Sequence, residues 1–338
     1  MQDCDTSVRI VSHDSVEQNI VEVLGLIGSE CIELHETITM TKQNWTSEDI
    51  PDQKNKVILI TGATSGLGKE ATKVLAGKNA TVIMAVRNLQ KAETVANEIR
   101  KAVPTATLEI RHLDLGSLTS VRAFARQLSS DHTRLDVLIN NAGVMMCPYS
   151  KTEDGFEIQM GTNHLTHFAL TGLLMPLLLA TKDSRVVATS SVAHKGGNIN
   201  FDDINWESRK YETTKAYSDS KLANLYFMYE LARKYKETKN APMFTCAHPG
   251  GTNTDLGRHL GIVQLLFGMI GQKVEMGTLP TLRAATDLTA KSGDYYGPKN
   301  FFEFRGYPEI VTANAMANDA AKAKKLWDLS VELTGVNY

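Results

Sequence analysis

Short apolar runs alternate with longer segments of mixed polarity along most of the chain. Each run holds five to seven mostly apolar residues, and the segments between them repeat apolar residues at the intervals of one helical face. We predict six strands, at 57–61, 80–86, 107–113, 135–140, 185–190 and 243–248. Helices are predicted between them, at 69–78, 89–103, 117–130, 155–181 and 216–237. A further amphipathic helix over 316–335 would end at Gly335, in the C-cap role that glycine favours.

The predicted strands are apolar nearly throughout, which is typical of strands buried on both faces. Strands that alternate with helices in this way form a parallel sheet covered by the helices. The predicted fold class is therefore α/β, a single doubly wound (Rossmann) parallel sheet with helices on both faces, which is an architecture that binds dinucleotides. No strand pattern lies outside this sheet, so we predict one domain over 54–338.

The first part of the chain has a different character. Residues 1–39 contain eight acidic residues and one basic residue, Arg9, without clear alternation. Because chain termini are usually loosely held, we predict that 1–53 is a poorly ordered N-terminal extension with no part in catalysis. Such an acidic tail could instead bind a partner.

The composition narrows the class of protein. Of the 338 residues, 42% are hydrophobic and 22% are charged, which are ordinary values for a soluble globular protein. The net charge of −2 argues against a dedicated binder of nucleic acid or of anionic membranes, which usually carries a basic excess. The four cysteines are far apart, at positions 4, 31, 147 and 246, and no cationic leader precedes an apolar N-terminal run. We therefore predict a cytoplasmic protein with free thiols.

Two apolar runs are candidates for membrane segments. LTGLLMPLLLA (170–180) and GIVQLLFGMIG (261–271) both fall short of the roughly 20 residues that a spanning helix needs. We therefore predict no membrane span. The second run could rest on a membrane surface or close over a substrate, or it could be a surface loop or a core helix.

The sequence TGATSGLG, Thr61 to Gly68, lies between the first predicted strand and the first helix. Its glycines follow G-x-x-x-G-x-G and not the common dinucleotide-binding pattern G-x-G-x-x-G. The context of strand, glycines and helix still places the free N–H groups of a helix start beside the loop, where they can bind a pyrophosphate. A flexible turn without a ligand is the alternative.

The charge at the end of the second strand indicates which dinucleotide would bind. NAD-binding folds usually have an acidic residue there, which accepts hydrogen bonds from the ribose hydroxyls. Between Ala71 and Ala92 the sequence has no acidic residue, and Arg87 stands where the acid would be. A guanidinium pairs with a 2′-phosphate, and Lys69 could add a second positive charge, so the sequence favours NADP(H) over NAD(H). Alternatively, Arg87 is a solvated residue at a helix start.

Tyr217 and Lys221 are four residues apart on one predicted helix, so their side chains share a face. A nearby ammonium favours the phenolate and would lower the tyrosine pKa toward the range of a general base. Ser191 ends the fifth strand at the carboxyl edge of the sheet, where ligands bind in doubly wound folds. The NNAG turn at 140–143 ends the fourth strand with small residues, and Asn163 lies in an apolar helix, where a buried amide needs a partner.

Together these motifs resemble the short-chain dehydrogenase/reductase family. The resemblance runs from about Lys56 to the C-terminus and covers, in the family's order, TGxxxGxG, LDL (113–115), NNAG, the Asn and Ser positions, Tyr-x-x-x-Lys and PGGTNT (249–254). HPG, the long segment before Tyr217 and the ending FFEFRGYP…LWDLSVELTG are similar to the group of retinol dehydrogenases, protochlorophyllide reductases and WW-domain oxidoreductases. Thr166 departs from this group, which often has Gly at that position.

The resemblance implies roles for four catalytic residues. Tyr217 would be the general acid/base, and Lys221 would lower the pKa of Tyr217 and hold the nicotinamide ribose. Ser191 would position the substrate oxygen, and Asn163 would anchor a water that relays protons from Lys221.

The resemblance also implies a cofactor site, in which Asp114 would contact the adenine and Thr254 would bind near the nicotinamide amide. The full set of implied cofactor-binding residues is Gly62, Thr64, Ser65, Gly66, Leu67, Gly68, Lys69, Arg87, Asp114, Leu115, Asn141, Ala142, Gly143, Tyr217, Lys221, Pro249, Gly250, Thr252 and Thr254.

The implied activity is that of an NADP(H)-dependent oxidoreductase, with 54–338 as its NAD(P)-binding catalytic domain. It would act on a carbonyl or alcohol of a fairly apolar small molecule, and the protein could form a homo-oligomer. The apolar character rests on the 261–271 run and on Phe301, Phe302 and Phe304, which could be core residues instead. The alternative is a non-catalytic, NADP(H)-sensing interaction protein on the same fold.

No metal site is predicted. His164 and His167 are three residues apart on the long helix, but no carboxylate motif lies beside them, and a metal needs three or four ligands. We interpret them as packing or surface histidines, and His194 and His248 as structural. Cys147 lies near the expected mouth of the site, but no adjacent base supports a nucleophilic role.

Overall fold

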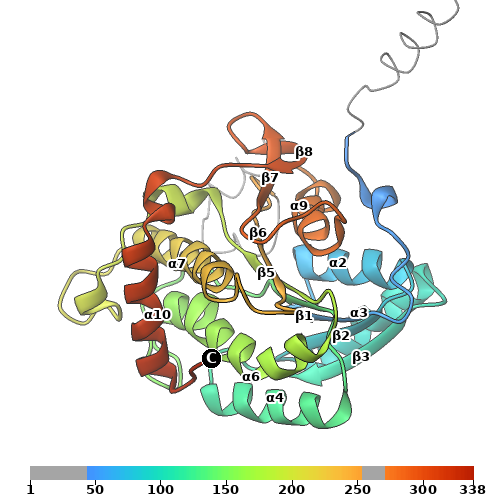
Figure 1. Cartoon of the computed structure of the whole chain (residues 1–338), viewed down its shortest axis with the longest axis horizontal. Helices are drawn as coiled ribbons and strands as arrows, with labels where there is room; N and C mark the ends of the chain where they lie inside the picture. The colour runs from blue at the N-terminus through green and yellow to red at the C-terminus, as the bar shows by residue number, and fades with distance from the viewer. Residues whose placement is uncertain (1–43, 253–270) are drawn as a thin grey trace, which may run out of the picture. The chain divides into compact units, whose positions relative to one another are not determined.

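The computed structural model describes residues 44–252 and 271–338 and arranges them around one eight-stranded sheet (Figure 1). The strands are β1 (Val57–Thr61), β2 (Thr81–Val86), β3 (Thr107–His112), β4 (Val137–Asn140), β5 (Arg185–Thr189), β6 (Met243–Ala247), β7 (Tyr295–Asn300) and β8 (Arg305–Ile310). Their order is β3-β2-β1-β4-β5-β6-β7-β8, and all of these pairs are parallel except β7 with β8. The predicted doubly wound sheet is confirmed, and its order reverses between β1 and β4.

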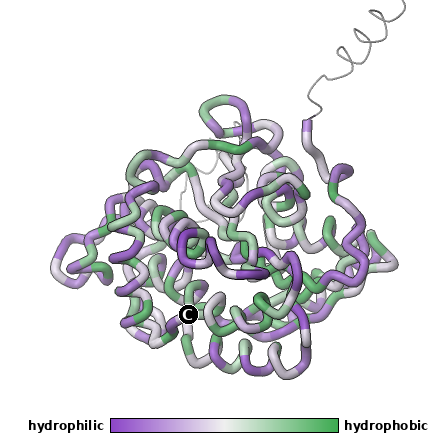
Figure 2. The backbone as a smooth tube through the Cα atoms, in the orientation of Figure 1, coloured by the Kyte–Doolittle hydropathy of each residue, from purple (hydrophilic) through white to green (hydrophobic). Residues whose placement is uncertain are grey.

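Helices cover both faces of the sheet. The longer ones are α2 (Gly66–Gly77), α3 (Leu89–Ala102), α4 (Leu118–Asp131), α6 (Thr166–Ala180), α7 (Thr213–Lys234), α9 (Val274–Thr286) and α10 (Ala320–Thr334). Ile58 and Ile60 of β1 pack in the core that includes α2, α3 and α9, whereas Leu59 packs in the core of α4, α6, α7 and α10. Both faces are therefore apolar, as the strand sequences indicate, while the outer loops are largely hydrophilic (Figure 2).

The sequence pattern does not predict β7, β8 or α9. β7 reads YYGPKN and β8 reads RGYPEI, and the glycine and proline in each obscure the strand pattern. β8 is the edge strand at this end of the sheet, where proline is tolerated, and β7 pairs with β6 only through Tyr295 and Tyr296, before its own proline. α9 contains Gly277 and Pro280, which interrupt its helical signal in the same way.

The helix predicted over 155–181 is not continuous. A short turn, α5 (Ile158–Met160), leads into a π-helical segment, Gly161–Leu165, and then into α6. The N–H of Thr166 bonds to the carbonyl of Gly161, one residue further back than in an α-helix. Such π-helical turns are frequent at functional sites, and this one contains Asn163.

The packed unit begins at Trp45. The sequence pattern assigns 45–53 to the extension, but these residues include a short 3₁₀-helix, Ser47–Asp49, and Ile50 is 3% exposed within the core. The remainder of the predicted extension, 1–43, lies outside the described residues.

The C-terminal helix is confirmed. α10 ends at Thr334, and the Gly335 that caps it has a left-handed φ of 63°. Trp327 of α10 packs on Phe168 of α6 with ring centroids 5.0 Å apart. Among the described residues, the helical run Ile158–Ala180 is the one stretch long and apolar enough to cross a membrane. Of its apolar window, 78% is buried inside the domain, as in the core helix of a soluble protein.

Candidate active site

The glycine loop connects β1 to α2. α2 begins at Gly66, and the preceding Ser65 makes no side-chain capping bond, so the first N–H groups of the helix lack a side-chain partner. Gly68 packs closely on the start of the loop, because a Cβ atom there would lie 2.3 Å from the carbonyl oxygen of Gly62. The loop is therefore a cradle of backbone atoms at a helix start, which is the environment that binds a pyrophosphate.

Thr61, at the end of β1, holds the NNAG turn. Its hydroxyl oxygen accepts hydrogen bonds from the backbone N–H groups of Asn141 at 3.0 Å and Ala142 at 2.9 Å. The Asn141 side chain donates to the Thr61 carbonyl at 2.9 Å. These bonds fix the end of β4 beside the glycine loop, where the strand order reverses and doubly wound folds bind their ligands.

The side-chain amide of Asn163 is buried, and both its oxygen and its nitrogen are hydrogen-bonded within the protein. Its oxygen accepts from the N–H of Val144 at 2.8 Å, and its nitrogen donates to the Val144 carbonyl and the Ser220 hydroxyl, both at 2.9 Å. A Cβ at Gly143 would lie 2.9 Å from this amide oxygen and 3.5 Å from Nζ of Lys221. Asn163 therefore fixes the backbone after NNAG, and its side-chain amide is not free to hold a water.

Tyr217 lies at the start of α7 and is 7% exposed. Burial raises its pKa to about 12, and a hydrogen bond with the Ser191 side chain opposes this shift. The sequence predicts a lowered pKa, with Lys221 as the cause. That prediction is wrong for this structure, because the loss of solvent around the phenol outweighs the other effects.

Lys221 lies one turn after Tyr217. Its Nζ donates to the carbonyl of Thr189 at 3.2 Å and is 5.6 Å from the centroid of the Tyr217 ring. Burial lowers the pKa of Lys221 to about 8. The two side chains therefore share a face, as predicted, and burial favours the neutral form of each.

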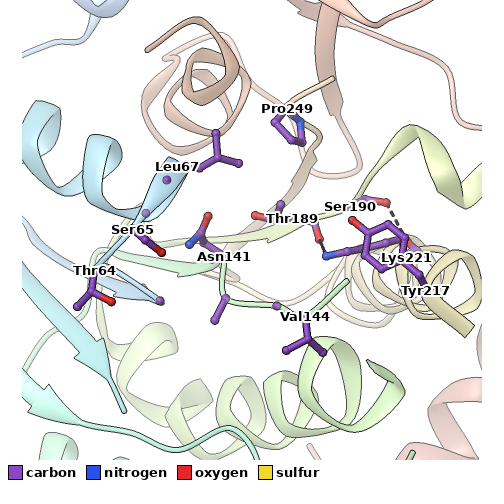
Figure 3. A pocket seen from close by; sticks show the side chains of 15 residues that line it. Thr64, Ser65, Leu67, Asn141, Val144, Thr189, Ser190, Tyr217, Lys221 and Pro249 are labelled. Atoms are coloured by element: carbon purple, nitrogen blue, oxygen red, sulfur yellow. Dashed lines mark hydrogen bonds between the residues drawn. The ribbon is translucent and has the colours of Figure 1, made fainter. Parts of the chain in front are cut away.

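The glycine loop, Tyr217 and Lys221 line one pocket (Figure 3). Its walls come from the ends of β1, β4, β5 and β6 and from α2 and α7. The lining residues are Gly62, Thr64, Ser65, Gly66, Leu67, Gly68, Asn141, Ala142, Gly143, Val144, Thr189, Ser190, Tyr217, Lys221 and Pro249. Sequence reasoning missed Val144, Thr189 and Ser190, although the last two directly precede Ser191. Ser190 donates to the Lys221 carbonyl at 2.9 Å and so holds α7 against β5.

A family model described as short chain dehydrogenase matches residues 56–262, more than half of the chain. The chain belongs to the short-chain dehydrogenase/reductase superfamily.

Similar proteins support this assignment. Retinol dehydrogenase 13 from Homo sapiens is 40% identical over 292 residues, covering 83% of this chain and 85% of that protein. Retinol dehydrogenase 14 from Mus musculus is 42% identical over 300 residues, covering 83% and 86%. An uncharacterized protein from Mycobacterium paratuberculosis has a solved structure with a TM-score of 0.75 and 40% identity, covering 88% and 99%. This short-chain dehydrogenase/reductase is therefore close in sequence to the retinol dehydrogenase group.

The superfamily assignment gives the chain a nicotinamide cofactor, and the pocket fits one. A structure assigned to a short chain dehydrogenase from Shigella flexneri 2a, complexed with NADP, matches with a TM-score of 0.59 and 27% identity, covering 72% of this chain and 97% of that one. In this chain, the backbone cradle at Gly68 suits a pyrophosphate, and Gly143, which has no side chain, lets the backbone pass close to Lys221, where a Cβ would lie 3.5 Å from Nζ.

The two basic residues predicted to meet a 2′-phosphate differ in their surroundings. Arg87 follows β2, is exposed and forms no ion pair with the residues that the structure describes. Lys69 pairs with Glu98 of α3, with Nζ 2.5 Å from Oε2 and side chains 39% and 53% exposed. Such an exposed pair is weak, so Lys69 can exchange partners.

Two other predicted contacts do not line the pocket. Asp114 and Leu115 follow β3, where Oδ1 of Asp114 accepts from the N–H of Gly116 at 2.8 Å. Leu115 is 8% exposed within the core, so only its backbone could reach a cofactor.

The PGG turn continues from β6. Pro249 lines the pocket, Gly250 has a φ of 63° and passes against the backbone of Phe304, and the Thr252 hydroxyl donates to the Pro249 carbonyl at 2.7 Å. Thr254 and most of the apolar run at 261–271 lie outside the described residues.

Three of the histidines in the described chain, His164, His194 and His248, have structural partners. Nε2 of His164 lies 2.9 Å from the Ser330 hydroxyl, and Nδ1 of His194 lies 2.7 Å from the Ser191 carbonyl. Nδ1 of His248 accepts from the N–H of Gly250 at 3.3 Å. Residues 44–252 and 271–338 contain no group of three or more His, Cys, Asp or Glu that could hold a metal.

The thiols of Cys147 and Cys246 are free. Burial raises the pKa of the Cys147 thiol, which opposes a nucleophilic role. Cys4 and Cys31 lie outside the described residues.

Proposed function

We propose that the protein is an NADP(H)-dependent oxidoreductase that interconverts the carbonyl and alcohol forms of a fairly apolar small molecule. The observation that carries this proposal is that one pocket joins the glycine loop to Tyr217 and Lys221. A dinucleotide cradle and a proton donor therefore open onto the same space.

The chain would hold the cofactor with residues that follow the ends of three strands, β1, β4 and β6. Gly62 and Gly68 would bind the pyrophosphate, and Asn141, Gly143 and Pro249 would bind the nicotinamide half. When bound, the nicotinamide would exchange a hydride with the substrate carbon.

Tyr217 would move the proton. Its raised pKa keeps the hydroxyl protonated at neutral pH, so that it can give its proton to the substrate oxygen during reduction. Ser191, whose side chain opposes the rise in the pKa of Tyr217, would orient the same oxygen. Lys221 would add a positive charge beside the phenolate that remains and hold the ribose of the cofactor.

Charge at the end of β2 supports NADP(H) as the cofactor. An acidic residue there would repel a 2′-phosphate, and none occurs between Ala71 and Ala92. The guanidinium of Arg87 is exposed and makes no ion pair with the described residues, so it is available to bind that phosphate.

Two observations support an apolar substrate, such as an alcohol of the retinol type. Relatives at 40% and 42% identity are named retinol dehydrogenases. In addition, the turn between β7 and β8 exposes Phe301 by 57% and Phe302 by 94%, and Phe304 in the same turn contacts Gly251 beside Pro249.

A substrate screen tests the proposal. Purified protein is assayed with aldehydes, ketones and alcohols, retinal and retinol included, using NADPH or NADP and, in parallel, NADH or NAD. We expect turnover of apolar carbonyl compounds with a preference for NADPH. Tyr217→Phe should lower turnover at least about a thousandfold and leave the NADPH dissociation constant within about threefold. Persisting turnover in this variant would exclude Tyr217 as the proton donor.

The same screen decides between this proposal and an NADP(H)-sensing interaction protein. The acidic segment 1–39 motivates that second function as a partner-binding tail. Tight NADPH binding without turnover of any substrate would favour it.

We also propose a cytoplasmic location, supported by the two free thiols among the described cysteines. Cell fractionation tests it, and recovery of the protein in the membrane fraction would contradict it.

A further inference from the structure

His167 lies between two structures that shape the pocket, the end of β1 and the π-helical segment. It is in the first turn of α6 and is 2% exposed. Its Nε2 lies 3.0 Å from Oγ1 of Thr61, and its Nδ1 lies 3.2 Å from the carbonyl oxygen of Asn163. One imidazole therefore joins the residue that holds the NNAG turn to the residue that fixes the backbone after it.

The hydrogen bonds of Thr61 determine where the proton of this ring lies. A hydroxyl has one proton to donate and two lone pairs to accept with. The Thr61 oxygen accepts from the N–H groups of Asn141 and Ala142, so its own proton points elsewhere. Nε2 of His167 at 3.0 Å is a closer acceptor than the carbonyl of Ile139 at 3.4 Å. Nε2 therefore accepts, and Nδ1 carries the proton and donates it to the Asn163 carbonyl.

The surroundings of His167 favour the same neutral form. Burial lowers its pKa to about 4, and the charge of Lys221 acts in the same direction. A protonated ring would present a second N–H donor to the Thr61 hydroxyl. The lone pairs of that hydroxyl already accept from the backbone N–H groups of the NNAG turn. His167 is not among the residues that line the pocket, so any effect on a ligand passes through Thr61 and Asn163.

We propose that His167 is a positioning residue for cofactor binding: its neutral ring orients the Thr61 hydroxyl and thereby fixes the NNAG turn relative to Asn163. The inference rests on the proposed function in one respect, that the pocket is the NADP(H) site. Without this acceptor the Thr61 proton has only the longer contact with Ile139, and the hydroxyl is free to turn away from the two N–H groups.

His164 provides a matched control. It lies three residues earlier and is equally buried, at 1% exposed. Its ring contacts Ser330 of α10 and packs edge-on against Phe227, with centroids 5.7 Å apart. If both histidines only fill space, replacing either by Phe affects the protein similarly. If His167 orients Thr61, only its replacement weakens cofactor binding.

The test uses the full chain, with NADPH binding followed by fluorescence titration and folding followed by thermal unfolding. We expect His167→Phe to raise the NADPH dissociation constant about tenfold, which corresponds to one hydrogen bond. His164→Phe should stay within about twofold of the unsubstituted protein, although both variants lose some thermal stability. His167→Gln, whose amide oxygen can accept from Thr61, should recover most of the affinity.

A double-mutant cycle tests the route through Thr61. Thr61→Val should weaken NADPH binding, and adding His167→Phe should cause little further loss, because both changes remove the same interaction. Additive losses would contradict the proposal. An unchanged dissociation constant in His167→Phe, or an equal increase in His164→Phe, would also overturn it.

Nitrogen-15 NMR of the imidazole in the unsubstituted protein covers the case in which His167→Phe does not fold. We expect a protonated Nδ1 and an unprotonated Nε2 at pH 7, and a proton on Nε2 would overturn the inference. Failure of the unsubstituted chain to bind NADPH would instead overturn the proposed function. The position of the ring proton separates these two failures, because it is measured without any ligand.

Discussion

Oε2 of Glu303 lies 3.2 Å from Nε2 of His248. Glu303 is in the turn between β7 and β8, and His248 follows β6 directly before Pro249 of the pocket. The other carboxylate oxygen accepts a hydrogen bond from Nζ of Lys195 at 2.9 Å, in the turn that follows Ser191. One carboxylate thus connects the segments that carry Ser191 and Pro249, which lie after different strands.

This carboxylate should make stability depend on pH. The contacts with His248 and then with Lys195 lower the pKa of Glu303 from 4.5 to about 2. Because the folded pKa is the lower one, the stabilisation is complete above about pH 4.5 and is lost as the pH falls toward 2. We expect Glu303→Gln to lower the free energy of unfolding at pH 7 by about 1–2 kcal/mol, measured by urea titration. The difference should shrink between pH 4.5 and 3, and a constant difference over this range would contradict the assignment.

The buried ammonium of Lys221 should lower the stability of the folded protein at neutral pH. Burial lowers the pKa of Lys221 from 10.5 to about 8, so the amine holds its proton less tightly in the folded state than in the unfolded state. This cost is complete below about pH 8 and disappears as the pH rises to 10.5. We expect Lys221→Met to raise the free energy of unfolding at pH 7 by about 1–3 kcal/mol while turnover is lost. The gain should be smaller at pH 10 than at pH 7, and a variant less stable than the original at pH 7 would refute this account.

Arg87 should decide between the two dinucleotides. Arg87→Asp replaces an attraction for the 2′-phosphate by a repulsion, so the NADPH dissociation constant should rise on the order of 100-fold. The NADH dissociation constant should change by less than about threefold, since NADH has no such phosphate. Lys69→Ala is the matched comparison and should weaken NADPH binding less, because Lys69 is already paired with Glu98. Equal losses for both dinucleotides in Arg87→Asp would remove Arg87 from the phosphate site.

Two glycines of α2 provide a paired test of the cradle. Gly68→Ala would push a methyl group into the Gly62 carbonyl, 2.3 Å away, and should abolish NADPH binding and cost about 2 kcal/mol or more of stability. At Gly77 the nearest atom to a new Cβ is on Val103 at 3.9 Å, an ordinary contact. Gly77→Ala should therefore stabilise the protein by about 0.5–1 kcal/mol and leave NADPH binding unchanged. Thermal unfolding and fluorescence titration measure both effects, and intact binding in Gly68→Ala would show that the cradle is not needed.

The centre of the sheet could be predicted from sequence because both of its faces are buried. Ile58, Leu59 and Ile60 all lie at 0% exposure, so the run is apolar without interruption. At the far end of the sheet, Pro298 of β7 pairs with Pro308 of β8, and neither strand has a comparable apolar run. The tendency to form a strand depends strongly on the neighbouring strands, so the local sequence pattern fails at this end of the sheet.

Many residues of the pocket follow the ends of β1, β4, β5 and β6, so their positions could be predicted from the topology of the sheet, and the helical spacing of Tyr217 and Lys221 predicted that they share a face. The side-chain partners of these residues and their protonation states could not be predicted. Lys69 meets Glu98 only because α2 and α3 pack together, and the pKa of Tyr217 depends on how much solvent the surrounding chain removes. The ion pair and the pKa shift both depend on how the chain packs, so the spacing of residues along the sequence does not predict them.

The position of β1 between β2 and β4 has a consequence for the synthesis of the chain. β2 follows β1 closely, whereas β4 begins only at Val137, after two further helices and β3. At a translation rate of about 5–20 residues per second, the nascent chain would have β1 with one unpaired edge for on the order of ten seconds. An apolar strand with free N–H and C=O groups is a template for pairing with other chains. The strand that supports the glycine loop is thus also a segment exposed to aggregation while the protein is being made.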